Sequence, residues 1–521
     1  MDRTPASPFP GLDLLAAIEA ARRGEGHLFT AGEGVVLDTI AALAANALEL
    51  YARLTLRQGP VFRVSALRYA MDVPEAVAAL VRANLVHTTI PGDRCLGAFD
   101  VIALRAACKR LNLTTSGSRS ALEDRLRGAA WVTEIVVMPA HAALLGRVEE
   151  LAGMERSLLV LERLGALKWA SYATTSGSGL YPDRRAMRLQ ERARRGEWEN
   201  GEALTVAQRG PSPWGKSPFR HAVAAVLADG ATADTLATIP GQRSRLALQL
   251  AAEGRVAEAV TVCRASDAAA VERVALDRTG RRLARAARLP FPPGPPLMEA
   301  PVRRLVLERA AAVAGPRPLW RTPDGPAPVE DAVVAHLAAV GRTAIHAENW
   351  FWTSCFALAF RELYWLPLPG RLPTNRRSGP MDIGTAAFYT ARREAVDAVL
   401  EDVFANGIRV GGWDGEILFG LSHAEMTISM AARIPPKLAA FILGRLSREG
   451  WAAARGLPDL LVLDGPPVRV PGAIPAQLDD SVILAEIKGP GDNLRDDQRV
   501  WHDGFVTSGN RVELWSVRDC L

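Results

Sequence analysis

The spacing of apolar residues along the first hundred positions predicts a mainly helical module. Apolar side chains recur at helical spacing from Leu12 to Ala21 and again from Val35 to Leu50. A strand-like piece, Val61 to Val64, precedes a helix-like run from Val73 to Val86, which leads into another short strand-like piece. This order of helices and short strands is typical of a winged-helix-like module, which we place at residues 1–97.

Residues 98–130 contain two short amphipathic helices joined by a Thr-Thr-Ser-Gly-Ser turn. The first helix places Leu104, Cys108 and Leu111 on one face, Leu122 and Leu126 pack from the second, and Gly117 can take the positive φ of a tight corner. This segment resembles the SAP motif, a compact DNA-binding hairpin, and an ordinary helical hairpin with solvated charges is the alternative. The resemblance implies DNA contacts from basic and hydroxyl side chains near the turn: Lys109, Arg110, Ser116, Arg119 and Arg125.

The chain from 131 to 345 is rich in Ala, Leu and Arg and has a helical pattern, with turns at Gly and Pro. Residues 245–263 form a helix, a Gly-containing turn and a second helix, spaced like one unit of a tetratricopeptide-type solenoid. No clean repeat period is present in this range. Arginine-rich runs at 184–195 and 278–288 are either solvated helix faces or phosphate contacts.

The C-terminal part carries the candidate chemistry. Asp459 leads into one apolar strand-like segment, and a later segment of the same kind includes Glu486. Alternation along this second strand puts Glu486 and Lys488 on one face and Ile487 on the other. Asp459, at the edge of the preceding strand, can meet them. Such carboxylates bind Mg²⁺ or Mn²⁺ through hard oxygen ligands, and the backbone carbonyl of Ile487 can add another. Lys488 beside the ion can orient the attacking water and offset charge in the transition state.

Taken alone, Pro-Asp followed by Glu-x-Lys is a weak pattern, and a strand ending in an ion pair is the alternative. Two features of the context favour the metal site. Lys488 is one of only five lysines among 62 Lys and Arg residues. The tail after it predicts a turn and then a helix with Leu494, Gln498 and Trp501 on one face.

Residues 456–501 resemble the virus-type replication-repair nuclease (VRR-NUC) domain, a branch of the PD-(D/E)xK nuclease superfamily. Upstream, Glu348 to Trp352, Gly379 to Ile383 and Phe388 to Arg393 resemble the lead-in of the Fanconi-associated nucleases, including bacterial members. The order of the modules agrees with that family. The resemblance implies a multidomain, mainly α fold with a C-terminal α/β nuclease domain at 346–521, built on a mixed sheet flanked by helices.

The resemblance also assigns roles to single residues. Asp459 and Glu486 match the metal-binding carboxylates of the family and Lys488 its catalytic lysine. Glu348 matches a further acidic ligand, although a carboxylate at a helix start that answers the macrodipole would look the same. Gln498 matches the helix that lines the site, where a buried structural amide is the alternative.

One departure from the family concerns phosphate binding. Arg377 aligns where the family usually has Gln shortly before Gly-Pro-x-Asp, which leaves the metal ligands intact but puts in doubt how water or phosphate is held. We expect Arg377 and Arg455 to contact DNA.

Composition limits the other possibilities. The chain has 521 residues, 49% hydrophobic and 23% charged, which excludes a disordered, collagen-like or small disulfide-stapled protein. A net charge of +5 is compatible with a polyanion partner but does not demonstrate one. The five cysteines show no C-x-x-C spacing, which argues against a zinc ribbon. No apolar stretch long enough to span a membrane is present, so we expect no membrane partner. The scattered cysteines fit a reducing cytoplasm, and the resemblance to bacterial family members implies a nucleoid-associated protein.

Metal-assisted phosphodiester hydrolysis follows from these residues, with one or two Mg²⁺ or Mn²⁺ ions. Activity as a 5′ flap endonuclease and 5′–3′ exonuclease, branched or flapped DNA as the partner, and a role in repair of damage such as interstrand crosslinks follow only from the resemblance. Protein partners stay undefined. A catalytically inactive scaffold that binds DNA junctions is the alternative, and a transcriptional regulator built on the winged-helix-like module is a third hypothesis.

Overall fold

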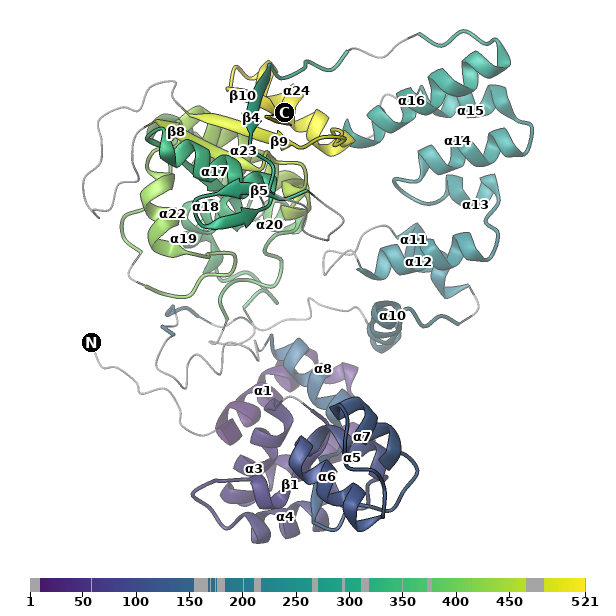
Figure 1. Cartoon of the computed structure of the whole chain (residues 1–521). Helices are drawn as coiled ribbons and strands as arrows, with labels where there is room; N and C mark the ends of the chain where they lie inside the picture. The colour runs from purple at the N-terminus through teal and green to yellow at the C-terminus, as the bar shows by residue number, and fades with distance from the viewer. Residues whose placement is uncertain are drawn as a thin grey trace. The chain divides into compact units, whose positions relative to one another are not determined.

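The chain folds into two units, residues 1–187 with 367–378 and residues 188–366 with 379–521 (Figure 1). A computed structural model describes residues 10–520 except 58, 154–166, 169, 174, 176–182, 200, 210–216, 265–269, 293–295, 311–317, 349, 373–376, 414 and 465–481. Among the described residues, no single helix is long and apolar enough to cross a membrane. The pair Ala31–Ala41 and Ala45–Leu56 would suffice by length and composition alone, but it is bent by 120° at its break.

The first unit combines helices with a small antiparallel sheet of order β1-β3-β2. Its strands pair at Phe62 with Val137 and at Val86 with Pro139. The elements are α1 (Pro10–Glu25), η1 (Gly26–Leu28), α2 (Ala31–Ala41), α3 (Ala45–Leu56), β1 (Phe62–Arg63), η2 (Val64–Ala66), α4 (Val73–Arg82), β2 (Val86–His87), α5 (Gly92–Cys95), η3 (Leu96–Ala98), α6 (Val101–Arg110), α7 (Arg119–Leu126), β3 (Val136–Pro139) and α8 (Ala142–Ala152).

The predicted hairpin is formed by α6 and α7. Ser118 caps α7 by accepting from the backbone N–H of Ala121, and Gly117 has φ +110° at the corner. Leu104, Cys108, Leu122 and Leu126 are fully buried, as predicted, but Leu111 is 36% exposed because α6 ends at Arg110, before this residue. The central strand β3 follows this hairpin, so the N-terminal module is not closed at residue 97. The sheet needs residues 136–139 because β3 pairs with both β1 and β2.

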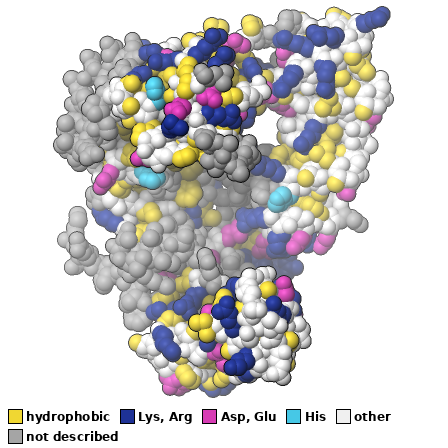
Figure 2. All heavy atoms as spheres, in the orientation of Figure 1, with side chains coloured by type: hydrophobic (Ala, Val, Ile, Leu, Met, Phe, Trp, Pro, Cys, Tyr) yellow, Lys and Arg dark blue, Asp and Glu magenta, His cyan; other side chains and the backbone are white. Residues whose placement is uncertain are grey.

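The second unit begins with a column of paired helices. Helices α14 and α15 form the helix-turn-helix expected for residues 245–263. The bounds are α10 (Arg184–Arg195, which starts in the first unit), α11 (Glu202–Gln208), α12 (Ser217–Ala228), α13 (Ala233–Ala237), α14 (Arg243–Ala252), α15 (Val256–Val262) and α16 (Ala270–Ala287). Figure 2 shows Lys and Arg side chains at several places on the visible face of this column. Helix α16 contacts α24, where Arg278 pairs with Asp496.

A five-stranded mixed sheet of order β4-β10-β9-β8-β7 forms the C-terminal part. Strand β10 is parallel to β4 and β9, and β8 is antiparallel to β7 and β9. The strands are β4 (Val302–Leu307), β7 (Arg342–His346), β8 (Leu460–Asp464), β9 (Ile483–Lys488) and β10 (Val512–Asp519), and a separate two-stranded sheet contains β5 (Trp320–Thr322) and β6 (Gly325–Ala327). A mainly helical chain with a C-terminal mixed sheet is the predicted fold class.

Helices cover both faces of this sheet (Figure 1). One face carries Leu461 and Leu484 into the larger core, and the other carries Val462 and Ile487 into a core with α17. The helices are α17 (Val329–Ala339), α18 (Trp350–Ala359), α19 (Arg361–Tyr364), α20 (Ala386–Ala391), α21 (Arg393–Asn406), α22 (Ala424–Ala431), α23 (Pro436–Glu449), η4 (Trp451–Ala454) and α24 (Asp496–Thr507). Strand β4 precedes residue 346 and β7 ends at it, so the sheet begins earlier than the predicted nuclease boundary.

Candidate active site

Three acidic residues lie at one end of the sheet because of its strand order. His346 pairs with Leu460, and the next backbone step continues this pairing, since the N–H of Ala347 donates to the carbonyl of Asp459 at 2.8 Å. Leu460 pairs with Ala485 on the other side. The end of β7, the start of β8 and the end of β9 therefore meet, and they carry Glu348, Asp459 and Glu486.

Direct hydrogen bonds connect Asp459, Glu486 and Lys488 to this sheet end. The Oδ2 atom of Asp459 accepts from the backbone N–H of Ile487 at 2.7 Å. Glu486 Oε1 accepts from Lys488 Nζ at 2.7 Å, and the Glu486 side chain is fully buried. The Ile487 side chain faces the opposite core, as strand alternation predicts. The structure thus brings together the three side chains singled out from sequence, while the Ile487 carbonyl stays a predicted ligand.

Gln498 holds Glu486 from helix α24. Its Nε2 atom donates to Glu486 Oε1, and its Oε1 atom accepts from the backbone N–H of Arg495 at 2.9 Å. The same amide therefore caps the start of α24 and orients the carboxylate. Leu494, expected on the helix, lies before it, because α24 starts at Asp496. Trp501 is buried on the predicted face.

Gly456 allows α24 to lie close to the segment that leads into strand β8. Its φ is +89°, and a Cβ at this position would lie 2.6 Å from the carbonyl carbon of Asp497. Any larger residue would push against the first turn of α24. The close approach lets Gln498 of α24 reach Glu486, a role of Gly456 that sequence reasoning missed although this glycine opens the Gly-Leu-Pro-Asp segment.

Burial controls the electrostatics of the two carboxylates. Burial, and then the charge of Asp459, raise the pKa of Glu486 to about 8. Burial also raises the pKa of Asp459 to about 6, although the Ile487 N–H and the charge of Lys488 oppose this. Both carboxylates stay above their ordinary pKa values despite the charge of Lys488, which is typical of buried carboxylates at functional sites.

The donor set at this end fits a divalent cation held by two carboxylates. The Oε2 atom of Glu486 is buried and has no hydrogen-bond partner among the described residues, a costly arrangement that a cation would relieve. Mg²⁺ is commonly held by one or two carboxylates, with water and substrate phosphate as the other ligands. In the described part of the chain, no three acidic, His or Cys side chains are gathered closely enough to hold a metal. Glu348 Oε1 lies 3.9 Å from Arg495 Nη2. That Glu348 also binds an ion stays a prediction.

Metal binding is expected to depend on pH through Glu486. Its folded pKa of about 8 exceeds the ordinary 4.5, so its stabilising proton is fully held below pH 4.5 and is lost as pH rises to about 8. Metal-free protein should therefore lose stability over that range. A cation replaces the proton, so Mn²⁺ should raise the melting temperature more at pH 8 than at pH 6. Thermal melts of wild type and Glu486→Gln check this. The variant has no proton to lose, and equal Mn²⁺ effects at both pH values in wild type would contradict the expectation.

Most of the side chains of the SAP-like hairpin that were predicted to contact DNA instead bond other groups of the protein. Arg125 donates to the carbonyls of Thr114 and Ser116, at 3.0 and 2.6 Å, and so holds the turn. Arg119 pairs with Glu123 at 2.6 Å. Arg110 donates to the carbonyl of Trp131 at 3.0 Å. Lys109 and Ser116 are both exposed to solvent. DNA contact by this group stays a prediction.

The other two predicted DNA contacts lie in different units. Arg377 belongs to the first unit, where its Nη1 donates to the carbonyl of Gly153 at 2.6 Å and its N–H donates to Tyr172 Oη at 2.8 Å. The arginine thus ties its loop to the end of α8. Arg455 is exposed in the second unit, four residues before Asp459.

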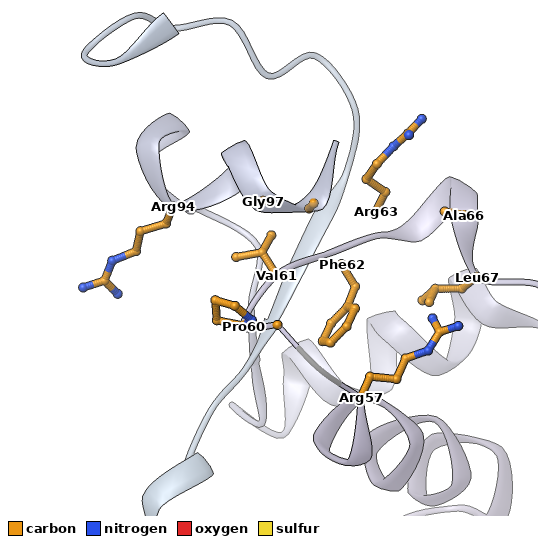
Figure 3. A pocket seen from close by; sticks show the side chains of 11 residues that line it. Arg57, Pro60, Val61, Phe62, Arg63, Ala66, Leu67, Arg94 and Gly97 are labelled. Atoms are coloured by element: carbon orange, nitrogen blue, oxygen red, sulfur yellow. The ribbon is translucent and has the colours of Figure 1, made fainter. Parts of the chain in front are cut away.

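A pocket of about 250 Å³ lies in the first unit (Figure 3). Its lining is apolar at Val61 and Phe62 and includes Arg57, Arg63 and Arg94. Arg63 and Arg94 point away from Val61 and from each other in Figure 3. The arginines do not converge, so the pocket lacks the arrangement that would bind one phosphate.

Comparison with known proteins agrees with the sheet-end geometry. The family model of the VRR-NUC domain matches residues 417–519. This part of the chain is similar to the VRR-NUC domain. It includes strands β8, β9 and β10 and helix α24, and therefore Asp459, Glu486, Lys488 and Gln498. Strands β4 and β7 and Glu348 lie outside the match.

Whole proteins and a solved structure are similar to this chain beyond the matched domain. A Fanconi-associated nuclease 1 homolog of Arabidopsis thaliana is 23% identical over 97% of this chain, which spans 66% of that relative's length. A Dictyostelium discoideum homolog is 26% identical over 37% of this chain and 19% of its own length. A crystal structure of paFAN1 bound to DNA with a two-nucleotide 5′ flap and a gap matches the whole chain with TM-score 0.71 and 22% identity. The predicted resemblance to the Fanconi-associated nucleases is confirmed.

Proposed function

We propose that the chain is a metal-dependent, structure-selective DNA nuclease that acts on 5′ flaps as an endonuclease and degrades 5′–3′ as an exonuclease. One observation carries the hydrolytic part. Glu486 is fully buried beside Asp459 and Lys488, and one of its oxygens has no partner among the described residues. A fold keeps such a carboxylate where a cation is needed.

The residues have separable tasks in this proposal. Asp459 and Glu486 would hold Mg²⁺ or Mn²⁺, and Glu348 would decide whether a second ion binds. Such an ion supplies Lewis-acid polarisation of the phosphate and a more acidic water. Lys488 holds a positive charge beside Glu486, where it would orient the attacking water and offset negative charge on the phosphate. Gln498 keeps Glu486 in one orientation.

The preference for flaps rests on the similarity to paFAN1, whose crystal structure holds 5′ flap DNA. Phosphate contacts from the hairpin and the solenoid would position duplex arms without reading bases. Repair of damage such as interstrand crosslinks is part of the proposal on the same ground.

A fluorescent 5′ flap tests the proposal. We expect the full chain to cut the flap in Mg²⁺ or Mn²⁺, to stop in EDTA, and to cut an unbranched duplex of the same sequence more slowly. Flap binding without cleavage in any divalent ion would instead favour a junction-binding scaffold. Tight sequence-selective binding to unbranched duplex would favour a regulator.

A further inference from the structure

His502 is a buried residue on the helix that lines the site, and the roles described above do not use it. Its side chain is 2% exposed. It follows Gln498 by four residues in α24, and side chains at this spacing are neighbours on one helix face. The imidazole therefore lies beside the amide that donates to Glu486.

The imidazole is neutral and has an unused nitrogen. Burial, together with the charges of Lys488 and Arg499, lowers the pKa of His502 to about 4. Its Nε2 atom is buried and has no hydrogen-bond partner among the described residues. A neutral imidazole has one nitrogen with a free lone pair, and a nearby cation favours the tautomer that turns this lone pair toward it.

Lys488 is the cation that this lone pair can serve. An ammonium group has three N–H donors, and Glu486 Oε1 accepts one of them. Gln498 donates to that same oxygen, and His502 is its neighbour one helical turn later in α24. We propose that His502 is a positioning residue whose Nε2, which has no direct partner among the described residues, accepts a hydrogen bond from a water that is held by the Lys488 ammonium.

This inference rests on the proposed nuclease function, because orientation of Lys488 matters only if Lys488 acts in cleavage. It goes beyond that function by assigning the second support of the lysine to a single atom. The assignment can be tested with amides, since the nitrogen or oxygen of Gln can occupy the place of Nε2 whereas those of Asn occupy the place of Nδ1.

The test compares His502→Leu, His502→Gln and His502→Asn in the full chain. Single-turnover cleavage is measured at saturating flap and Mn²⁺, with flap affinity and melting temperature measured alongside. We expect the Leu and Asn variants to be about tenfold slower than wild type, with unchanged flap affinity, and the Gln variant to recover most of the rate. Wild-type rates in the Leu variant, or equal recovery by Gln and Asn, would overturn the proposal.

A second readout does not need cleavage. Because the chain has five lysines, the Nζ signals of ¹⁵N-lysine-labelled protein can be assigned with single Lys→Arg variants. The Lys488 signal should move in the Leu and Asn variants and return in Gln, while Lys437 stays in place as the control. If wild type fails to cut any flap, the nuclease function fails, and these signals still decide the contact. An unmoved Lys488 signal in all three variants would refute it.

Discussion

Replacing Asp459 with alanine is expected to slow flap cleavage by on the order of 10³-fold or more while flap affinity stays near that of wild type. Asp459 supplies one of the two carboxylates at the sheet end and also accepts from the Ile487 N–H. Its loss would remove one of the two proposed cation ligands, whereas the proposed duplex contacts lie on other elements. Single-turnover cleavage and fluorescence anisotropy on the same flap measure the two quantities.

Two further variants make this result interpretable. Asp459→Asn keeps an oxygen for the Ile487 N–H but lacks the negative charge, so it should fold normally and be nearly as slow as the alanine variant. Glu449→Ala removes an exposed carboxylate that pairs with Arg445 at the end of α23, and it should cut at the wild-type rate. Substantial cleavage by Asp459→Asn would show that the charge of Asp459 is not needed.

Asp382→Ala is expected to destabilise the second unit by about 3–5 kcal/mol. Asp382 Oδ2 pairs with Arg392 Nη1 at 2.8 Å, and both side chains are completely buried. Arg392 also donates to the carbonyl of Leu363 at 3.1 Å and lies over the Phe388 ring. Without the carboxylate, a buried guanidinium charge is left uncompensated. Urea unfolding followed by tryptophan fluorescence measures the loss.

An exposed ion pair provides the matched control. Asp402 pairs with Arg409, whose side chain is 70% exposed, so Asp402→Ala should cost no more than about 1 kcal/mol. The double variant Asp382→Leu with Arg392→Met should recover part of the loss, because it removes both buried charges. If Asp382→Ala and Asp402→Ala unfold at the same urea concentration, the buried pair does not hold the fold together.

The central part of the site could be predicted because it depends on local rules. Alternation along a strand puts Glu486 and Lys488 on one face whatever the rest of the fold does. Helical spacing likewise predicts that Gln498 and Trp501 share a face. The meeting of Asp459 with Glu486 needs only that consecutive strands pair, which is the common arrangement.

Long-range pairing could not be predicted in this way. Strand β4 pairs with β10 across roughly two hundred residues, and its burial pattern is exposed at Val302 and Val306, so nothing in its sequence marks it as part of the nuclease sheet. Strand β3 joins β1 and β2 after the SAP-like hairpin and has only four residues. For this reason, all three boundaries taken from the sequence, at 97/98, 130/131 and 345/346, fall within the span of a sheet.

The partners of long polar side chains also could not be predicted from the sequence pattern. Arg125 looked like a phosphate contact, yet its guanidinium holds the turn of its own hairpin. Arg377 likewise bonds a carbonyl at the end of α8. A charged residue in a run has many possible partners, and only the folded chain selects among them.

The amide of Gln498 joins two events that are usually independent, the start of a helix and the restraint of a carboxylate. Arg278 of α16 pairs with Asp496 in the same first helical turn. Fraying of that turn would therefore loosen Glu486. If duplex DNA binds the helices that end with α16, as proposed, a movement of α16 would reach Glu486 through Arg278, the first turn of α24 and Gln498.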